Sequence, residues 1–136
     1  MKINWIFYLL ILGLLFVACD DDDDDDDVME NEITINILEP TEGETIALAD
    51  CAEVHLHIEF TATVEMHEIE IELHPEDDVD DVIFEYDEHN HDLQIDFEQD
   101  VNLCDYAGQC FHLEVASYKD HDGNEKERAD VEFCLE

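Results

Sequence analysis

Positive charge is scarce in this sequence: 136 residues contain four Lys+Arg against 41 Asp+Glu, a formal net charge of −37. A nucleic-acid-binding protein needs a basic surface to neutralise phosphates, so this balance excludes a nucleic-acid partner. The same charge opposes direct adsorption to an anionic membrane surface. Glycine and proline are also rare, at four and two residues, and no Gly-rich phosphate-binding loop is present.

Catalytic nucleophiles are equally scarce. Ser117 is the only serine, and it lies on the buried phase of a predicted strand. The carboxylates are too abundant to single out one acid–base pair, and a small sandwich offers little room for a cleft. We therefore predict that the protein is not an enzyme.

Long apolar runs are limited to the N-terminus, where residues 5–18 carry no charge and follow Lys2. Fourteen residues are too few to span a bilayer, which needs about 20. The pattern predicts a signal peptide over 1–18. Its end, Phe-Val-Ala-Cys, resembles a bacterial lipobox, which implies that Cys19 is lipidated and begins the mature chain. An ordinary signal peptide followed by a chance cysteine is the alternative.

Eight consecutive aspartates occupy positions 20–27. Like charges at this density repel, so we expect residues 19–31 to form an extended, solvated tether. An acidic stretch directly after the lipidated cysteine also resembles the surface-export signal of Bacteroidota lipoproteins. That resemblance implies an outer-membrane lipoprotein that faces outward, with the lipid anchor as its contact with the membrane.

The remaining residues, 32–136, read as short strands. Apolar and polar residues alternate with period two, which is typical of sheets that are buried on one face. The alternating segments are 33–38, 54–60, 69–73, 82–86, 93–98, 111–116 and 131–135. The pattern predicts an all-β, antiparallel sandwich of about seven strands. After the aspartate run, 33 carboxylates and three cations leave a formal charge of −30.

Two segments resemble parts of bacterial immunoglobulin-like domains. Residues 33–46, ITINILEPTEGETI, look like the opening strand and first turn. Residues 111–136, FHLEVASYKDHDGNEKERADVEFCLE, look like the closing hairpin with its Asp-Gly turn. The whole chain is similar to small Bacteroidota surface lipoproteins with an immunoglobulin-like domain and a His-x-His segment. No established activity accompanies that resemblance.

Four cysteines, Cys51, Cys104, Cys110 and Cys134, follow the lipidation site. An even number in an exported chain predicts two disulfides, with three connectivities open. In an immunoglobulin-like order all four lie at one end of the sandwich, so topology does not decide among them. We favour Cys104–Cys110, which closes a short loop, together with Cys51–Cys134. A zinc site built from cysteines is the alternative.

Histidine is unusually frequent, with eight residues. His55 and His57 point to one face of a predicted strand. If the strand at 93–98 pairs with theirs, its carboxylates lie beside them. His89 and His91 form a second pair, and the two pairs could meet across a sheet edge. We therefore interpret His55, His57, His89 and His91 as a surface site for a divalent metal ion such as zinc or copper. The alternative is a solvated face on which protonated histidines offset carboxylate crowding.

Calcium is a weaker prospect. Residues 76–81 form a dense acidic loop, but no turn glycine or spaced ligand set accompanies it, so a solvated loop is favoured. Residues 120–124 resemble the start of a calcium loop, but Val131 stands where the final glutamate belongs, so a hairpin turn explains them better.

These patterns favour a non-enzymatic surface lipoprotein. It would present an immunoglobulin-like module for binding or adhesion, or serve as an accessory to an outer-membrane complex. Two other interpretations stay open: a lipoprotein that captures a divalent metal ion, and a structural component of the surface coat.

Overall fold

The structure, a computed structural model, describes residues 29–47 and 53–136. The predicted signal peptide, Cys19, the aspartate run and Cys51 lie outside the described residues. No helix in the described ranges is long and apolar enough to cross a membrane.

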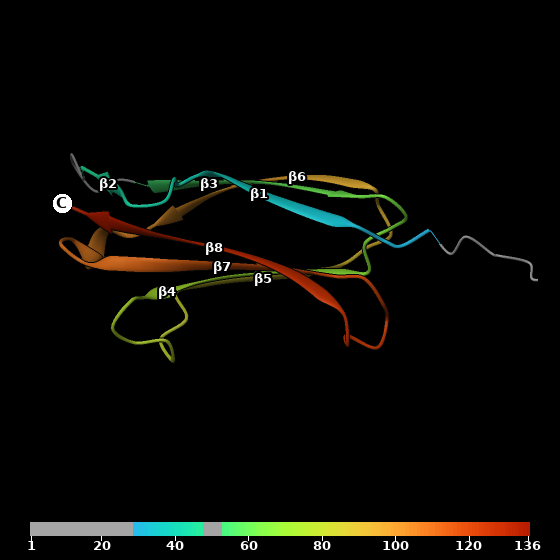
Figure 1. Cartoon of the computed structure of the whole chain (residues 1–136). Coiled ribbons are helices and arrows are strands. Elements are labelled where there is room, and N and C mark those ends of the chain that lie inside the picture. Colours follow the sequence, from blue (N-terminus) through green and yellow to red (C-terminus); the bar gives the residue numbers. More distant parts are fainter. Residues whose placement is uncertain (1–28, 48–52) are drawn as a thin grey trace, which may run out of the picture.

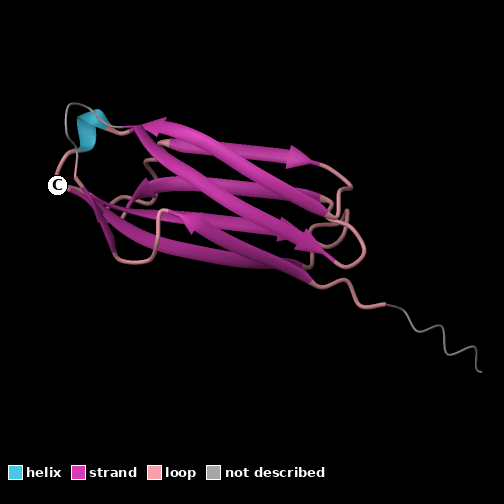
Figure 2. Cartoon of the chain, turned by 90° about the horizontal axis from the view of Figure 1, so that it is seen from above, coloured by secondary structure: helices cyan, strands magenta, loops and turns pink. Residues whose placement is uncertain are grey.

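The described residues form eight strands and one short 3₁₀ helix, η1, at Cys104–Tyr106 (Figure 1). The strands are β1 Ile33–Glu39, β2 Glu44–Ile46, β3 Glu53–Ala62, β4 Glu68–Pro75, β5 Phe84–His89, β6 Gln94–Asn102, β7 Cys110–Tyr118 and β8 Lys126–Leu135. Figure 2 shows that strands make up nearly the whole body, with the helix at the end where the C-terminus lies. The predicted all-β class is confirmed.

The strands form two sheets, one in the order β1-β3-β6 and one in the order β2-β8-β7-β4-β5. All neighbours are antiparallel except β2 and β8, which are parallel. In immunoglobulin lettering the order corresponds to A-B-E in one sheet and G-F-C-C′ in the other, with β2 added at the edge. The predicted immunoglobulin-like sandwich is therefore confirmed, with eight strands in place of about seven.

The core lies between the sheets and is built from the apolar phase of each strand. Leu56, Ile58 and Phe60 of β3 are fully buried, and so are Phe111 and Leu113 of β7. Burying each such side chain contributes about 1.5–3 kcal/mol relative to exposure. The opposite phase of the same strands carries the carboxylates, so one alternation separates the apolar core from the acidic surface.

Strand β2 was not predicted, because three residues are too few to show alternation. A turn at Gly43, where φ is 71°, takes the chain from β1 to the other sheet. The Gly43 N–H donates to the Glu132 carbonyl at 2.8 Å as β2 joins β8. Glycine suits this turn because it adopts positive φ without a steric penalty.

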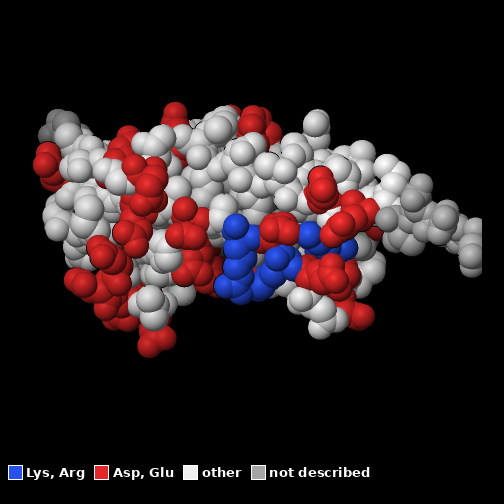
Figure 3. All heavy atoms as spheres, in the orientation of Figure 1, with Lys and Arg blue, Asp and Glu red and all other residues white. Residues whose placement is uncertain are grey.

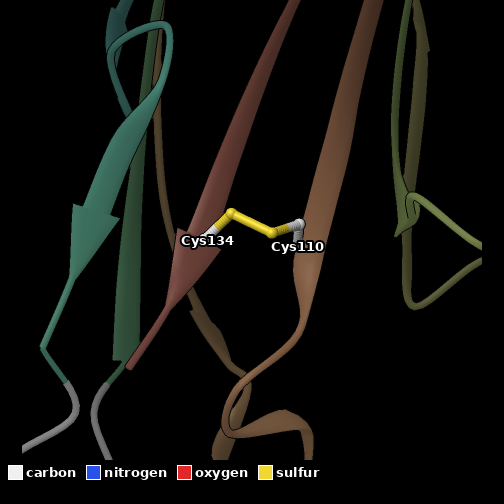
Figure 4. Close-up of a disulfide and its surroundings, with 2 residues drawn as sticks. All are labelled: Cys110 and Cys134. Atoms are coloured by element: carbon white, nitrogen blue, oxygen red, sulfur yellow. A yellow bond between two sulfur atoms is a disulfide. The ribbon is translucent and has the colours of Figure 1, made fainter.

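The disulfide pairing differs from the one we favoured. Cys110 is joined to Cys134 (Figure 4), and both Cys104–Cys110 and Cys51–Cys134 are therefore wrong. The two residues face each other directly in the β7–β8 register, with their Cα atoms 3.9 Å apart. Cys104 is disulfide-bonded as well. Oxidation of these cysteines also removes them from the alternative zinc site.

Removing the β7–β8 bridge should destabilise the domain. The bridged residues are 24 positions apart, and closing such a loop restricts the unfolded chain by roughly 3 kcal/mol. Replacing both Cys110 and Cys134 by Ala should lower the free energy of unfolding in urea by about that amount. Peptide mapping without reduction should recover the Cys110–Cys134 crosslink, and recovery of a Cys104–Cys110 peptide would contradict the pairing.

Candidate metal centre

Three loops meet at the end of the sandwich where the described chain begins (Figure 1). They join β3 to β4, β5 to β6 and β7 to β8. Backbone hydrogen bonds tie them together: the Met66 N–H donates to the Asp92 carbonyl at 3.2 Å, and the His67 N–H donates to the Tyr118 carbonyl at 3.0 Å. The corresponding end of antibody variable domains carries the antigen-binding loops.

Four histidines gather at this loop end. His67 precedes β4, His89 ends β5, and His91 and His121 lie in the β5–β6 and β7–β8 loops. The His67 ring centroid is 4.0 Å from that of His121 and 5.2 Å from that of His91. His89 is 5.0 Å from His91 and 5.5 Å from His121 by the same measure. We call these four residues the loop histidine cluster.

His67, His91 and His121 have the geometry of a metal-binding set. One ring nitrogen from each lies within 4.8 Å of the other two. A metal ion placed among three such nitrogens would contact them after small side-chain rotations, since metal–nitrogen bonds are about 2.0–2.1 Å long.

His67 is the buried member of the set. Its exposed fraction is 8%, and its Nδ1 has no hydrogen-bond partner among the described residues. Burial, followed by the nearby His121, lowers the pKa of His67 below its usual value, so the imidazole is neutral near pH 7. A buried polar atom without a partner costs about 1–3 kcal/mol. A bound metal ion would remove that cost.

Glu65 provides a carboxylate beside the cluster. Its Oε1 lies 3.5 Å from His67 Nε2, and its Oε2 lies 3.3 Å from His91 Nδ1. A proton on His67 Nε2 faces this carboxylate, which leaves the Nδ1 lone pair for a metal ion. Metal-binding histidines commonly donate their other ring N–H to a carboxylate in this way.

The predicted four-histidine site does not form. His89 and His91 belong to the loop histidine cluster, whereas His55 and His57 lie on β3 in the other sheet. Strand β3 is central in its sheet and β5 is the edge of the other, so the two pairs cannot meet across a sheet edge.

His55 and His57 contact carboxylates of β6 instead. His55 Nδ1 is 2.7 Å from Asp100 Oδ1, and His57 Nε2 is 2.8 Å from Asp96 Oδ1. Strands β3 and β6 pair, which is the condition under which these carboxylates were expected beside the two histidines. His57, Glu59 and Asp96 also bring three ligand atoms together, but on an open surface where carboxylate pairing already accounts for the histidine.

Sequence reasoning missed His67 and His121. Each is isolated in the sequence, and only the meeting of separate loops brings them to His91. The available signal was the high histidine count combined with an immunoglobulin-like order, which places these loops at one end. In the described part of the chain, no convergent group of ligands includes a carboxylate of residues 76–81.

Comparisons with known proteins point to no function, so a proposal for function has to start from the arrangement of these histidines. No protein-family model matches the chain, and no curated protein matches it.

The contact between His55 and Asp100 predicts a pH dependence. The hydrogen bond to Asp100 raises the pKa of His55, and Glu39 and Glu98 raise it further. A pKa raised on folding stabilises the folded state below the unfolded value of about 6.5, and this stabilisation is lost as pH rises through the folded pKa. His55→Gln should therefore lower the melting temperature near pH ~5.5 and have little effect near pH ~9.

Asp100→Asn provides the matched control, since it removes the same contact from the other side. It should reproduce the pH-dependent difference. An equal loss of melting temperature at both pH values in His55→Gln would show that packing, and not the charged contact, is responsible.

Proposed function

We propose that this protein is an exported, lipid-anchored immunoglobulin-like module that binds a divalent transition-metal ion at its loop end. His67, His91 and His121 are the proposed ligands. The observation that carries the proposal is the convergence of their ring nitrogens within 4.8 Å around a buried histidine. The ligand chemistry alone sets the class of metal.

The ligand atoms favour a borderline metal ion. Neutral imidazole suits zinc, copper and nickel, whereas calcium and magnesium prefer oxygen ligands. Three histidines leave a fourth position for water or for His89. Capture of such an ion, without a chemical reaction, is the function that these contacts support best.

Binding of another macromolecule at the same end is the second candidate function. Val64 and Leu93 are exposed there, with exposed fractions of 44% and 50%. Leu93 lies beside the end of β3, because the Ala62 N–H donates to the Leu93 carbonyl at 2.8 Å, and Val64 is two residues after Ala62 in the chain. Exposed apolar side chains on recognition loops are typical of binding modules.

The proposed anchor would place the loop end toward the membrane. The described chain begins beside the cluster, where Asn31 Nδ2 donates to the Glu65 carbonyl at 2.6 Å. Asn31 is twelve residues after Cys19, and twelve extended residues reach roughly 40 Å. The tether therefore lets Asn31, at the loop end, lie at most roughly 40 Å from a lipid on Cys19.

The lipid anchor is tested by Cys19→Ala. We expect the unchanged protein to fractionate with membranes and to incorporate labelled fatty acid. The variant should do neither, because the thioether-forming sulfur is gone. Membrane association that persists in Cys19→Ala would contradict the proposal, and protease treatment of intact cells checks the outward orientation.

The loop site is tested by zinc titration of the detergent-solubilised mature protein after metal removal. Nitrogen-15 spectra of the imidazole rings should show shifts at His67, His91 and His121. His121→Gln should weaken zinc binding at this site at least tenfold, as expected for loss of a ligand.

His55→Gln is the control, because it removes a histidine from outside the cluster and should leave zinc affinity unchanged. Unshifted rings of the loop histidine cluster at millimolar zinc would overturn the proposal. Equal losses in the His121 and His55 variants would do the same.

A further inference from the structure

Two other histidines face each other on the outer side of the five-stranded sheet. His74 of β4 and His112 of β7 are direct partners in the antiparallel register. Glu114 lies two residues farther along β7, on the same face. One ligand atom from each of these three residues lies within 4.8 Å of the other two. His74 is only 3% exposed although it shares the outward phase of β4.

Neighbouring acceptors fix the orientation of both rings. His74 Nδ1 lies 3.2 Å from the Pro75 carbonyl, and His112 Nε2 lies 3.1 Å from Asp130 Oδ2. A carbonyl or carboxylate oxygen only accepts, so each of these nitrogens carries the proton. In a neutral ring the other nitrogen then presents a lone pair: Nε2 in His74 and Nδ1 in His112.

Both lone pairs point at one carboxylate oxygen. Glu114 Oε1 is 3.4 Å from His74 Nε2 and 3.3 Å from His112 Nδ1. Three acceptors at this separation repel one another unless a cation lies between them. That cation is either a second proton on an imidazole or a metal ion. Histidines held by a carbonyl and by a carboxylate on their far side are the arrangement found around protein-bound metals.

Two members of the trio, His112 and Glu114, border a hollow of about 380 Å³. His112, Glu114 and Asp130 line one part of it, and Lys126 and Arg128 line another. Figure 3 shows the lysine and arginine side chains gathered on one face among carboxylates. Three protein ligands leave coordination positions that water or a small ligand in this hollow can fill.

We propose that His74 Nε2, His112 Nδ1 and Glu114 Oε1 form a second divalent-metal site, of the two-histidine, one-carboxylate type. Zinc and cobalt(II) are the probes that fit this ligand set. The site shares no residue with the loop histidine cluster and does not rest on the function proposed for it. Its ligands come from adjacent strands, so sheet register places them and the contacts with Pro75 and Asp130 orient the two rings.

The experiment is a zinc and cobalt titration of the metal-free, detergent-solubilised mature protein. In the unchanged protein, zinc should shift the ring nitrogens of both His74 and His112. Cobalt should add visible absorption bands typical of low coordination number. Glu114→Gln should weaken binding at this site at least tenfold, and Asp130→Asn should weaken it about 10- to 100-fold through loss of the His112 orientation.

Two controls separate this proposal from the loop site. His121→Gln should leave the zinc shifts of His74 and His112 unchanged, and Glu114→Gln should leave those of His67 and His91 unchanged. Nitrogen-15 shifts in the unchanged protein decide the matter even if a variant fails to fold. His74 and His112 rings that respond to pH but not to millimolar zinc would overturn the proposal, because the cation between them is then only a proton.

Discussion

The structure has to pair many carboxylates with very few permanent cations. Among the described residues, ten contacts within 4.0 Å join a basic nitrogen to a carboxylate, and eight of the ten use histidine. Only Lys119 and Lys126 supply the others. Lysine and arginine stay charged at any physiological pH, whereas a histidine places positive charge beside a carboxylate only when its ring is protonated or holds a metal ion. The net charge of this surface therefore depends on the pH and on the metal ions available to its histidines.

Sheet geometry determines which carboxylates lie next to the histidines. Period-two alternation sends apolar side chains into the core and polar ones outward, so histidines on one strand face carboxylates on the next. His55 and Asp100 are direct partners in the β3–β6 ladder, and His112 and Glu132 are direct partners in the β7–β8 ladder. Crowded carboxylates still repel one another and lower stability. The apolar core and the covalent β7–β8 bridge oppose that repulsion, and among the described residues only Lys119 and Lys126 add ion pairs from fixed cations.

The same alternation explains how much could be predicted from sequence. Long alternating runs, such as the one that became β3, identified seven strands and the sandwich, whereas three-residue β2 left no pattern to detect. Alternation does not show which residues of two strands lie opposite each other, or which loops lie side by side. Contacts that depend on either could therefore not be predicted from the sequence. Cys110 and Cys134 pair because they are opposite in the last hairpin, and spacing alone favoured a different bridge. His89 and His91 were predicted as metal ligands, but the histidines that lie beside them, His67 and His121, come from other loops.

The two proposed metal sites differ in what preorganises them. The loop histidine cluster depends on three separate connections keeping their conformation, so ordering those loops takes part of the binding energy. His74 and His112 are held by a continuous ladder, and their far nitrogens are already oriented by Pro75 and Asp130. Two divalent ions would add four positive charges to residues 28–136, which carry a formal charge of −30. Because any ion that binds only the folded state stabilises it, metal binding and relief of carboxylate repulsion would act together.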